Sequence, residues 1–244
     1  MKIRLLQKLL PFAAVLALSA CSSPPAGVAI HDPDEAQNRK VHAFNKAVDK
    51  NLVAPIARGY GATVPLQADR AISNVASNLA IPGEIVNSTL QLNFEDVITN
   101  TIRFVTNTVF GLGGLVDAAT LLGMEEDVDT DFGETLYVYG FPEGRYLEVP
   151  FYGPRTERET YGIVVDFFID PVGNVLPSSA RKVTFPLYIV DKIGDRHEYD
   201  DVINGILYES EDSYSTARSL YLQNRRFQLG GQVDLNDLED PYAD

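Results

Sequence analysis

The chain has 244 residues, 45% of them hydrophobic, and a formal net charge of −14 at pH 7. This length suits one domain or two small ones, with ample apolar content for a core. Because so acidic a surface repels phosphate backbones and anionic headgroups, the composition argues against nucleic-acid binding and against docking through a basic patch.

Residues 1–20 have the features of a bacterial targeting signal. Three basic residues are followed by an apolar run at 9–18 and by the sequence LSAC, which ends at Cys21. This ending resembles a lipobox, in which the cysteine becomes the acylated first residue of the mature protein. Cys21 is the only cysteine, so no disulfide can form within the chain. An ordinary signal peptide or anchor is the alternative. Ser22 favours sorting to the outer membrane, and residues 21–31 are expected to form the lipidated tether.

The first helix is expected to begin near residue 32. Asp32 is a candidate cap, Pro33 suits the first helical position, and Glu35 completes an arrangement similar to a capping box. Apolar residues then recur at helical spacing until Pro55, which predicts the end of the helix. A second helix is expected at 66–79, a break at the Ile-Pro-Gly sequence of 81–83, and a third helical piece at 84–92.

The most informative stretch begins at Asn93, which can cap a helix. On a helix, its polar residues share one narrow face, and the rest of the circumference is apolar or threonine. These polar residues are Asn93, Asp96, Asn100, Arg103 and Asn107. A helix of roughly 20 residues, at about 1.5 Å each, is roughly as long as a bilayer core is thick. The stretch can therefore face lipid and present a polar line inward, or form a core helix with satisfied amides.

The second half combines a predicted hairpin with further helices. Two β-prone runs at 135–139 and 146–152 flank a turn at 140–144, and Gly140 and Gly144 would make this turn mobile. Helices are expected around 182–193, at 200–207 and after the capping residue Asp212. The last helix should turn Tyr214, Ala217, Leu220 or Tyr221, and Phe227 inward and place Arg218, Arg225 and Arg226 outside. The acidic tail at 230–244 is expected to be disordered.

The chain lacks the common catalytic and metal-binding motifs. It has no G-x-S-x-G, H-E-x-x-H or C-x-x-C sequence, and its G-L-G-G run lacks the Lys-Ser or Lys-Thr of a phosphate loop. An acidic run at 125–134 lacks the glycine and glutamate that a calcium loop requires. The sequence therefore predicts no enzyme activity, no metal and no cofactor.

Three spaced motifs resemble the MlaA (VacJ) family of outer-membrane lipoproteins. The first is D-P-x-E-x-x-N-R-x-x-x-x-F-N-x-x-x-D at 32–49. The second is N-x-x-R-F-x-x-N-T-x-x-G-x-G-G-x-x-D at 100–117. The third comprises D-F-G at 131–133 and P-x-Y-G-P at 150–154, followed by Arg158.

The resemblance implies a mainly α fold over residues 32–229, a ring-like helical bundle embedded in the outer membrane with a short β-hairpin-like segment. It also implies removal of mislocalised phospholipids from the outer leaflet through an amphipathic channel. The phospholipids would pass to a periplasmic lipid carrier of the MlaC type, and the protein would sit beside a trimeric porin. Neither a cofactor nor nucleic acid is implied as a partner.

Seven residues are candidates for the transport path. The polar stripe suggests that Asn100, Arg103 and Asn107 line a headgroup path. The family's Phe-Asn motif, at Phe44 and Asn45, and the glycines Gly140 and Gly144 are expected to control opening. Two other classes stay open: a structural lipoprotein that braces a porin without moving lipid, and a lipid-modifying enzyme.

Overall fold

The computed structural model describes residues 30–175 and 178–230. The expected signal, Cys21, the tether as far as residue 29 and the tail after residue 230 lie outside these residues. The first helices are α2 (Glu35–Val48), η2 (Asp49–Val53), α3 (Ala54–Thr63), α4 (Leu66–Leu90), α5 (Phe94–Val109), α6 (Ala118–Leu121) and α7 (Phe132–Val138). After the strands β1 (Tyr146–Val149) and β2 (Gly153–Thr156) come α8 (Glu157–Ile169), α9 (Pro171–Val175), α10 (Ser178–Glu198), α11 (Asp200–Asn204), η3 (Gly205–Glu209) and α12 (Ser213–Gln228). The mainly α prediction is confirmed.

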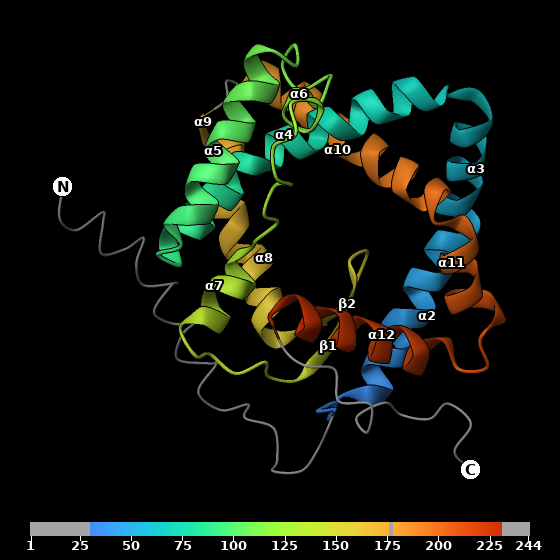
Figure 1. The fold of residues 1–244 in the computed structure, drawn as a ribbon. Coiled ribbons are helices and arrows are strands. Elements are labelled where there is room, and N and C mark those ends of the chain that lie inside the picture. The colour runs from blue at the N-terminus through green and yellow to red at the C-terminus, as the bar shows by residue number, and fades with distance from the viewer. Residues whose placement is uncertain (1–29, 176–177, 231–244) are drawn as a thin grey trace.

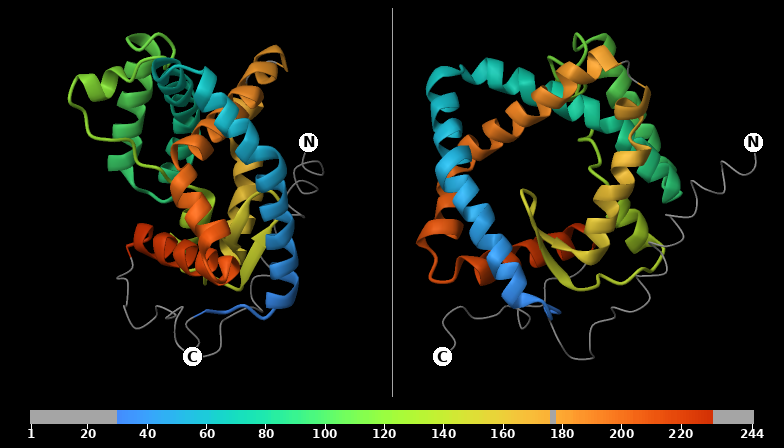
Figure 2. Two further views of the ribbon diagram at one scale, coloured as in Figure 1. Left: turned by 90° about the vertical axis from the view of Figure 1, so that its right-hand side faces the viewer. Right: turned by 180° about the vertical axis from the view of Figure 1, so that it is seen from behind.

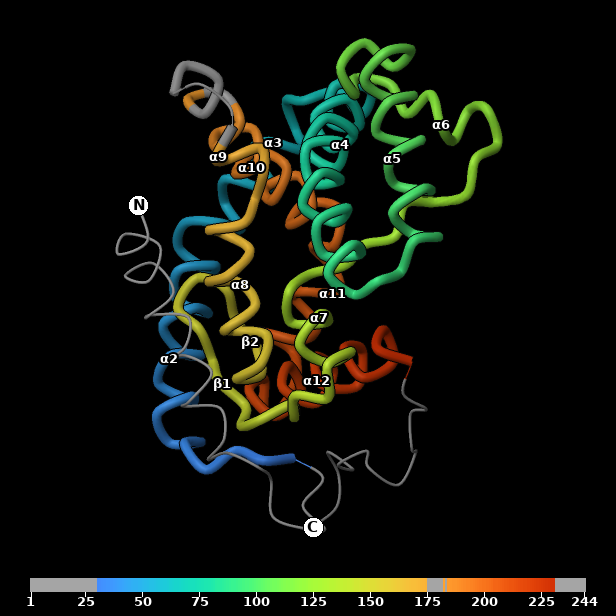
Figure 3. The backbone as a smooth tube through the Cα atoms, turned by 90° about the vertical axis from the view of Figure 1, so that its left-hand side faces the viewer, coloured from blue at the N-terminus to red at the C-terminus, as the bar shows by residue number. Residues whose placement is uncertain are grey.

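The helices are arranged as a ring. In Figure 1, α2 and α3 form one side, α4 the top, α8 and α7 the opposite side and α12 the bottom, while α10 packs along α3 and α4. The β1–β2 hairpin points from the lower edge toward the middle of this ring, as the view from behind also shows (Figure 2). Helix α5 packs against α4, and together with α6 it projects from one face of the ring (Figure 3).

The first helical segment differs from the prediction at both ends. Asp32 does not cap it, because its carboxylate binds Asn38 at 2.9 Å and Arg218 at 2.7 Å, and the helix begins at Glu35. The segment also continues past Pro55. A π-helical turn, η2, closes with a bond from the Ala54 N–H to the Asp49 carbonyl, and Pro55 then occupies the first turn of α3. Proline is tolerated there because its missing N–H has no helical partner to lose.

Two further expectations about element boundaries are wrong. Helix α4 runs unbroken through Pro82, so the predicted break at 81–83 and the separate piece at 84–92 do not exist. Residues 132–138 form α7 where a strand was expected at 135–139, because Asp131 caps this helix by accepting from the Glu134 N–H at 2.8 Å. The hairpin is therefore β1–β2, paired from Tyr146↔Thr156 to Val149↔Gly153, with its turn at 150–152.

The usual distribution of polar and apolar side chains is inverted. Most of the buried side chains in the described residues are polar or charged, and the apolar face of α5 is exposed at Phe94, Ile98, Ile102 and Val109. Exposed aromatic residues continue on α8 and α10, at Phe167, Phe168 and Phe185. Apolar patches of this extent mark interaction surfaces. Within the described residues, no helix combines the length and hydropathy needed to cross a bilayer.

The predicted face of α12 is only partly right. Tyr214 is buried and Asp212 caps the helix, as expected. Of the alternatives Leu220 and Tyr221, Tyr221 packs against the core and Leu220 is 45% exposed. Phe227, expected inward, is 67% exposed. Arg218, expected outside, is buried because it pairs with Asp32, and Arg225 pairs with Asp131 and Glu159. Carboxylates on neighbouring elements bring these arginines inward, which periodicity alone cannot indicate.

Candidate functional site

The polar face of α5 is buried against the segment that follows the helix. Asn93 caps α5 as expected, its side chain accepting from the Asp96 N–H. Asn100 is 0% exposed and pairs with the backbone of Val128 in both directions, at 3.0 Å and 2.9 Å. Its amide thus replaces a backbone partner for residue 128 and fixes the acidic loop to the helix.

Arg103 and Asn107 make the same kind of contact farther along the helix. Arg103 is 3% exposed, donates to the Glu125 carbonyl at 2.6 Å and pairs with Asp117 at 3.2 Å. Asn107 is 5% exposed and accepts from the Ala119 N–H at 2.8 Å. The stripe therefore fastens the 110–131 segment to α5, and contact of these side chains with a headgroup would require that segment to move.

A buried carboxyl lies beside this stripe. Glu84 of α4 is 8% exposed, and its Oε2 accepts weakly from Asn100 at 3.4 Å. Burial raises the pKa of Glu84 to about 8, and the nearby charges of Asp127 and Asp129 act in the same direction. Glu84 is therefore mostly protonated at neutral pH.

Phe44 and Asn45 hold the hairpin. Asn45 donates to the Val149 carbonyl at 3.0 Å and accepts from the Phe151 N–H at 2.8 Å, so its amide bonds the end of β1 and the middle of the turn. The rings of Phe44 and Phe151 meet edge to face with centroids 5.3 Å apart. The Phe-Asn motif thus ties α2 to the hairpin tip inside the ring.

His42 on α2 makes contacts that the sequence analysis did not predict. Its ring nitrogens lie 3.2 Å from Glu148 Oε1 and 3.1 Å from Ser213 Oγ. It is buried and joins α2 to β1 and to the start of α12. Only the fold brings these three residues together, because they are more than 100 positions apart in sequence.

Gly140 and Gly144 lie outside the hairpin, which corrects the expectation that they form its turn. Gly140 follows α7 and Gly144 precedes β1, with φ values of +79° and +77°. A Cβ at Gly140 would meet open space, whereas one at Gly144 would lie 2.8 Å from the Glu157 Cβ. These glycines permit left-handed backbone between α7 and the hairpin.

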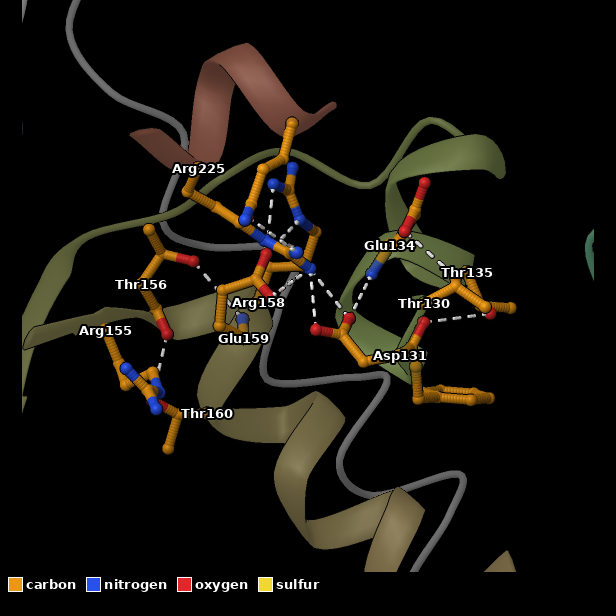
Figure 4. Close-up of polar contacts among 12 residues, drawn as sticks. Thr130, Asp131, Glu134, Thr135, Arg155, Thr156, Arg158, Glu159, Thr160 and Arg225 are labelled. Atoms are coloured by element: carbon orange, nitrogen blue, oxygen red, sulfur yellow. Dashed lines mark hydrogen bonds and ion pairs between the residues drawn. The ribbon is translucent and has the colours of Figure 1, made fainter. Parts of the chain in front are cut away.

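A charged cluster links α12 to α7 and α8 (Figure 4). Arg225 binds both oxygens of Asp131, at 2.7 Å and 2.9 Å, and Glu159 Oε2 at 2.7 Å. The cluster borders a cavity of about 230 Å³, lined by Asp129, Asp131, Arg155, Glu159, Ile163, Asp166, Tyr221, Arg225 and Gln228. Sequence analysis placed Arg225 outside and missed this site. Within the described residues, no group of three or more His, Cys, Asp or Glu is arranged to hold a metal.

Comparison with known proteins agrees with this architecture. The model of the family described as "MlaA lipoprotein" matches residues 30–228. The Escherichia coli protein named intermembrane phospholipid transport system lipoprotein MlaA is 33% identical over 248 residues, covering 100% of this chain and 95% of that protein. Its Haemophilus influenzae namesake is 30% identical over 202 residues, covering 82% of this chain and 79% of that protein.

A solved structure extends the likeness to the fold. That structure, described under "Structural basis for maintenance of bacterial outer membrane lipid asymmetry", superposes with a TM-score of 0.68 at 30% identity. The match covers 81% of this chain and 98% of that one. The family match spans both the α5 stripe and the hairpin held by α2. The chain therefore belongs to the MlaA lipoprotein family.

Proposed function

We propose that this protein moves phospholipids between the membranes of a bacterial envelope and thereby maintains outer-membrane lipid asymmetry. In this proposal it removes mislocalised phospholipids from the outer leaflet through the ring and passes them to a periplasmic carrier of the MlaC type. Relatives named for intermembrane phospholipid transport support the assignment. No bond is made or broken in such a transfer, so it requires neither enzyme activity nor a cofactor.

The inverted surface carries the proposal. A ring with exposed Phe94, Ile98 and Ile102 on one helix, and with mostly polar buried side chains, suits a body embedded in lipid. An amphiphile crossing such a body needs hydrogen-bonding partners for its headgroup and an apolar surface for its tails. The arrangement offers both kinds of surface.

The expected anchor and partners complete the proposal. Acylation at Cys21 would hold the protein in the outer membrane, since multiple acyl chains give stable attachment at about 0.8 kcal/mol per buried CH₂. Exposed aromatic residues on α8 and α10 are available to a trimeric porin or to lipid.

The hairpin is the proposed moving part. Its tip lies inside the ring and is held to α2 by Asn45 and by the Phe44–Phe151 contact. Release of these few contacts would free the tip without unfolding a helix. Phe44 and Asn45 are thus proposed to control opening. Gly140 and Gly144 would affect opening indirectly, because they lie in the segment that links α7 to β1.

Lipid transport is tested by deletion and complementation. Loss of the protein should raise detergent sensitivity and the amount of outer-leaflet phospholipid, and the wild-type gene should restore both. Phospholipid should also co-purify with the full chain. A protein that only braces a porin would restore porin levels and carry no phospholipid, which would refute the proposal. Release of fatty acid or headgroup from vesicles would indicate a lipid-modifying enzyme instead.

A further inference from the structure

The cavity beside Arg225 is large enough for a small polar group. Its volume of about 230 Å³ far exceeds the ~15 Å³ that one water molecule requires by this measure. It lies between α12, α8, β2 and the acidic loop that precedes α7. Arg155 contributes from β2, so the cavity shares a wall with the hairpin proposed to move.

Most of the charged groups in the cavity wall already have partners. Arg225 is neutralised by Asp131 and Glu159. The Asp166 carboxylate accepts from the Asn87 amide at 2.9 Å and from the Phe132 N–H at 3.1 Å. These groups build the wall and have little bonding capacity left for a ligand.

Two charged groups remain available. Arg155 donates to the carbonyl of the neighbouring Pro154 and lies 5.6 Å from the Tyr221 ring centroid, but it forms no ion pair with a described residue. Asp129 is exposed, and its side chain has no hydrogen bond or ion pair within the described part of the chain. Among the described residues, the cavity wall therefore offers one guanidinium and one carboxylate that form no ion pair.

We propose that this cavity binds a zwitterionic headgroup, with a phosphate at Arg155 and a primary ammonium at Asp129. The inference rests on the proposed function, which supplies the lipid, and it names phosphoethanolamine as the headgroup class. A guanidinium binds phosphate in a fixed fork, and a carboxylate accepts from an ammonium. The four carboxylates and two guanidinium groups of the wall disfavour a headgroup that is only anionic, such as phosphoglycerol.

The test measures binding of soluble headgroups to the purified full chain by calorimetry. Glycerophosphoethanolamine should bind more tightly than glycerophosphoglycerol or inorganic phosphate. Asp129→Asn and Arg155→Gln should each weaken its binding about tenfold, the loss typical of one charge-assisted hydrogen bond. Matched controls are Glu126→Gln, an exposed carboxylate in the same loop, and Arg70→Gln, an exposed arginine on α4, neither of which lines the cavity. Both should bind as the wild type does.

The outcomes separate this inference from lipid transport. Equal binding of the three probes, binding of none of them, or equal effects of Asp129→Asn and Glu126→Gln would overturn the headgroup assignment. A parallel assay follows removal of phosphatidylethanolamine and phosphatidylglycerol from vesicles that contain both. Removal of both lipids at equal rates would overturn the headgroup preference and leave transport intact. Removal of neither would refute the proposed function itself.

Discussion

The Asn45→Ala variant tests the attachment of the hairpin to α2. Asn45 is the only described side chain whose amide bonds both the Val149 carbonyl and the Phe151 N–H, at 3.0 Å and 2.8 Å. Alanine removes both bonds and leaves the helix intact, because alanine is the best helix former. We therefore expect the hairpin tip to be released while the ring stays folded.

The magnitude follows from these two bonds, since the third bond of Asn45, to Glu148 Oε1, is long at 3.4 Å. A hydrogen bond contributes about 0.5–1.5 kcal/mol net, so their loss should destabilise the docked hairpin by about 1–3 kcal/mol. This corresponds to a rise of about 5- to 150-fold in the ratio of released to docked hairpin. Phe44→Ala removes only the ring contact with Phe151, worth about 0.5–1.5 kcal/mol, and should have a smaller effect.

Amide hydrogen exchange measures this population directly. In Asn45→Ala, exchange of the Phe151 and Tyr152 amides should accelerate by the factor above. Exchange in α4 and α10, and of the Tyr146 and Glu148 amides that bond His31 and Asn38, should be unchanged. Asn51→Ala is the matched control, because Asn51 also lies on this helical segment but bonds only the Ala47 carbonyl. Equal exchange of the hairpin amides in the two variants would refute the assigned role of Asn45.

Four further predictions concern the stripe, the buried acid, the glycines and the anchor. Arg103→Leu leaves Asp117 without its buried partner and should cost about 3 kcal/mol in denaturant unfolding; an unchanged midpoint would contradict the fastening role. For Glu84, the raised folded pKa means that the folded state keeps a proton that the unfolded state releases between about pH 4.5 and 8. Wild-type stability should thus fall with rising pH across that window, and thermal melts of Glu84→Gln should lack this fall. Gly144→Val should lower the melting temperature more than Gly140→Val, since only the former meets Glu157. Cys21→Ser should abolish incorporation of radiolabelled palmitate into the protein, since acylation is proposed at this residue.

Local chemistry made several elements predictable. The spacing of Asn100, Arg103 and Asn107 identified α5 and its polar face, and Asn93 and Asp212 were recognised as caps because their side chains accept from the first turn. An exposed apolar face of α5 was one of the two alternatives that the pattern left open, and the structure shows that alternative. The binding partners of the polar stripe could not be predicted. They are backbone groups of the following loop, such as Val128, and helical periodicity contains no information about them.

The proline positions show the limits of local rules. Pro55 and Pro82 were both expected to end helices, yet one lies in the first turn of α3 and the other inside α4. Tertiary packing outweighs the loss of one helical bond at Pro82, because α4 packs against both α5 and α10. A sequence window contains no information about those neighbours.

The hairpin and the charged cavity depended on distant residues. β-Propensity placed a strand at 135–139, but the Asp131 cap and the close approach of Gly162 to Gly133 make that region a helix packed on α8. Arg225 meets Asp131 and Glu159 across 94 and 66 positions of sequence. Such contacts between distant residues can be identified only from the folded structure.

The central claim is that phospholipid passes through the interior of the ring, and site-specific photo-crosslinking in living cells tests it most directly. A crosslinker in place of Tyr152, at the hairpin turn inside the ring, should capture phospholipid, as should one in place of Phe94 on the exposed face of α5. Capture of phospholipid at Tyr152 should require that lipid is moving through the ring, whereas capture at Phe94 should not. Capture only at Phe94 would contradict the account and leave an anchored ring that lipid surrounds without entering.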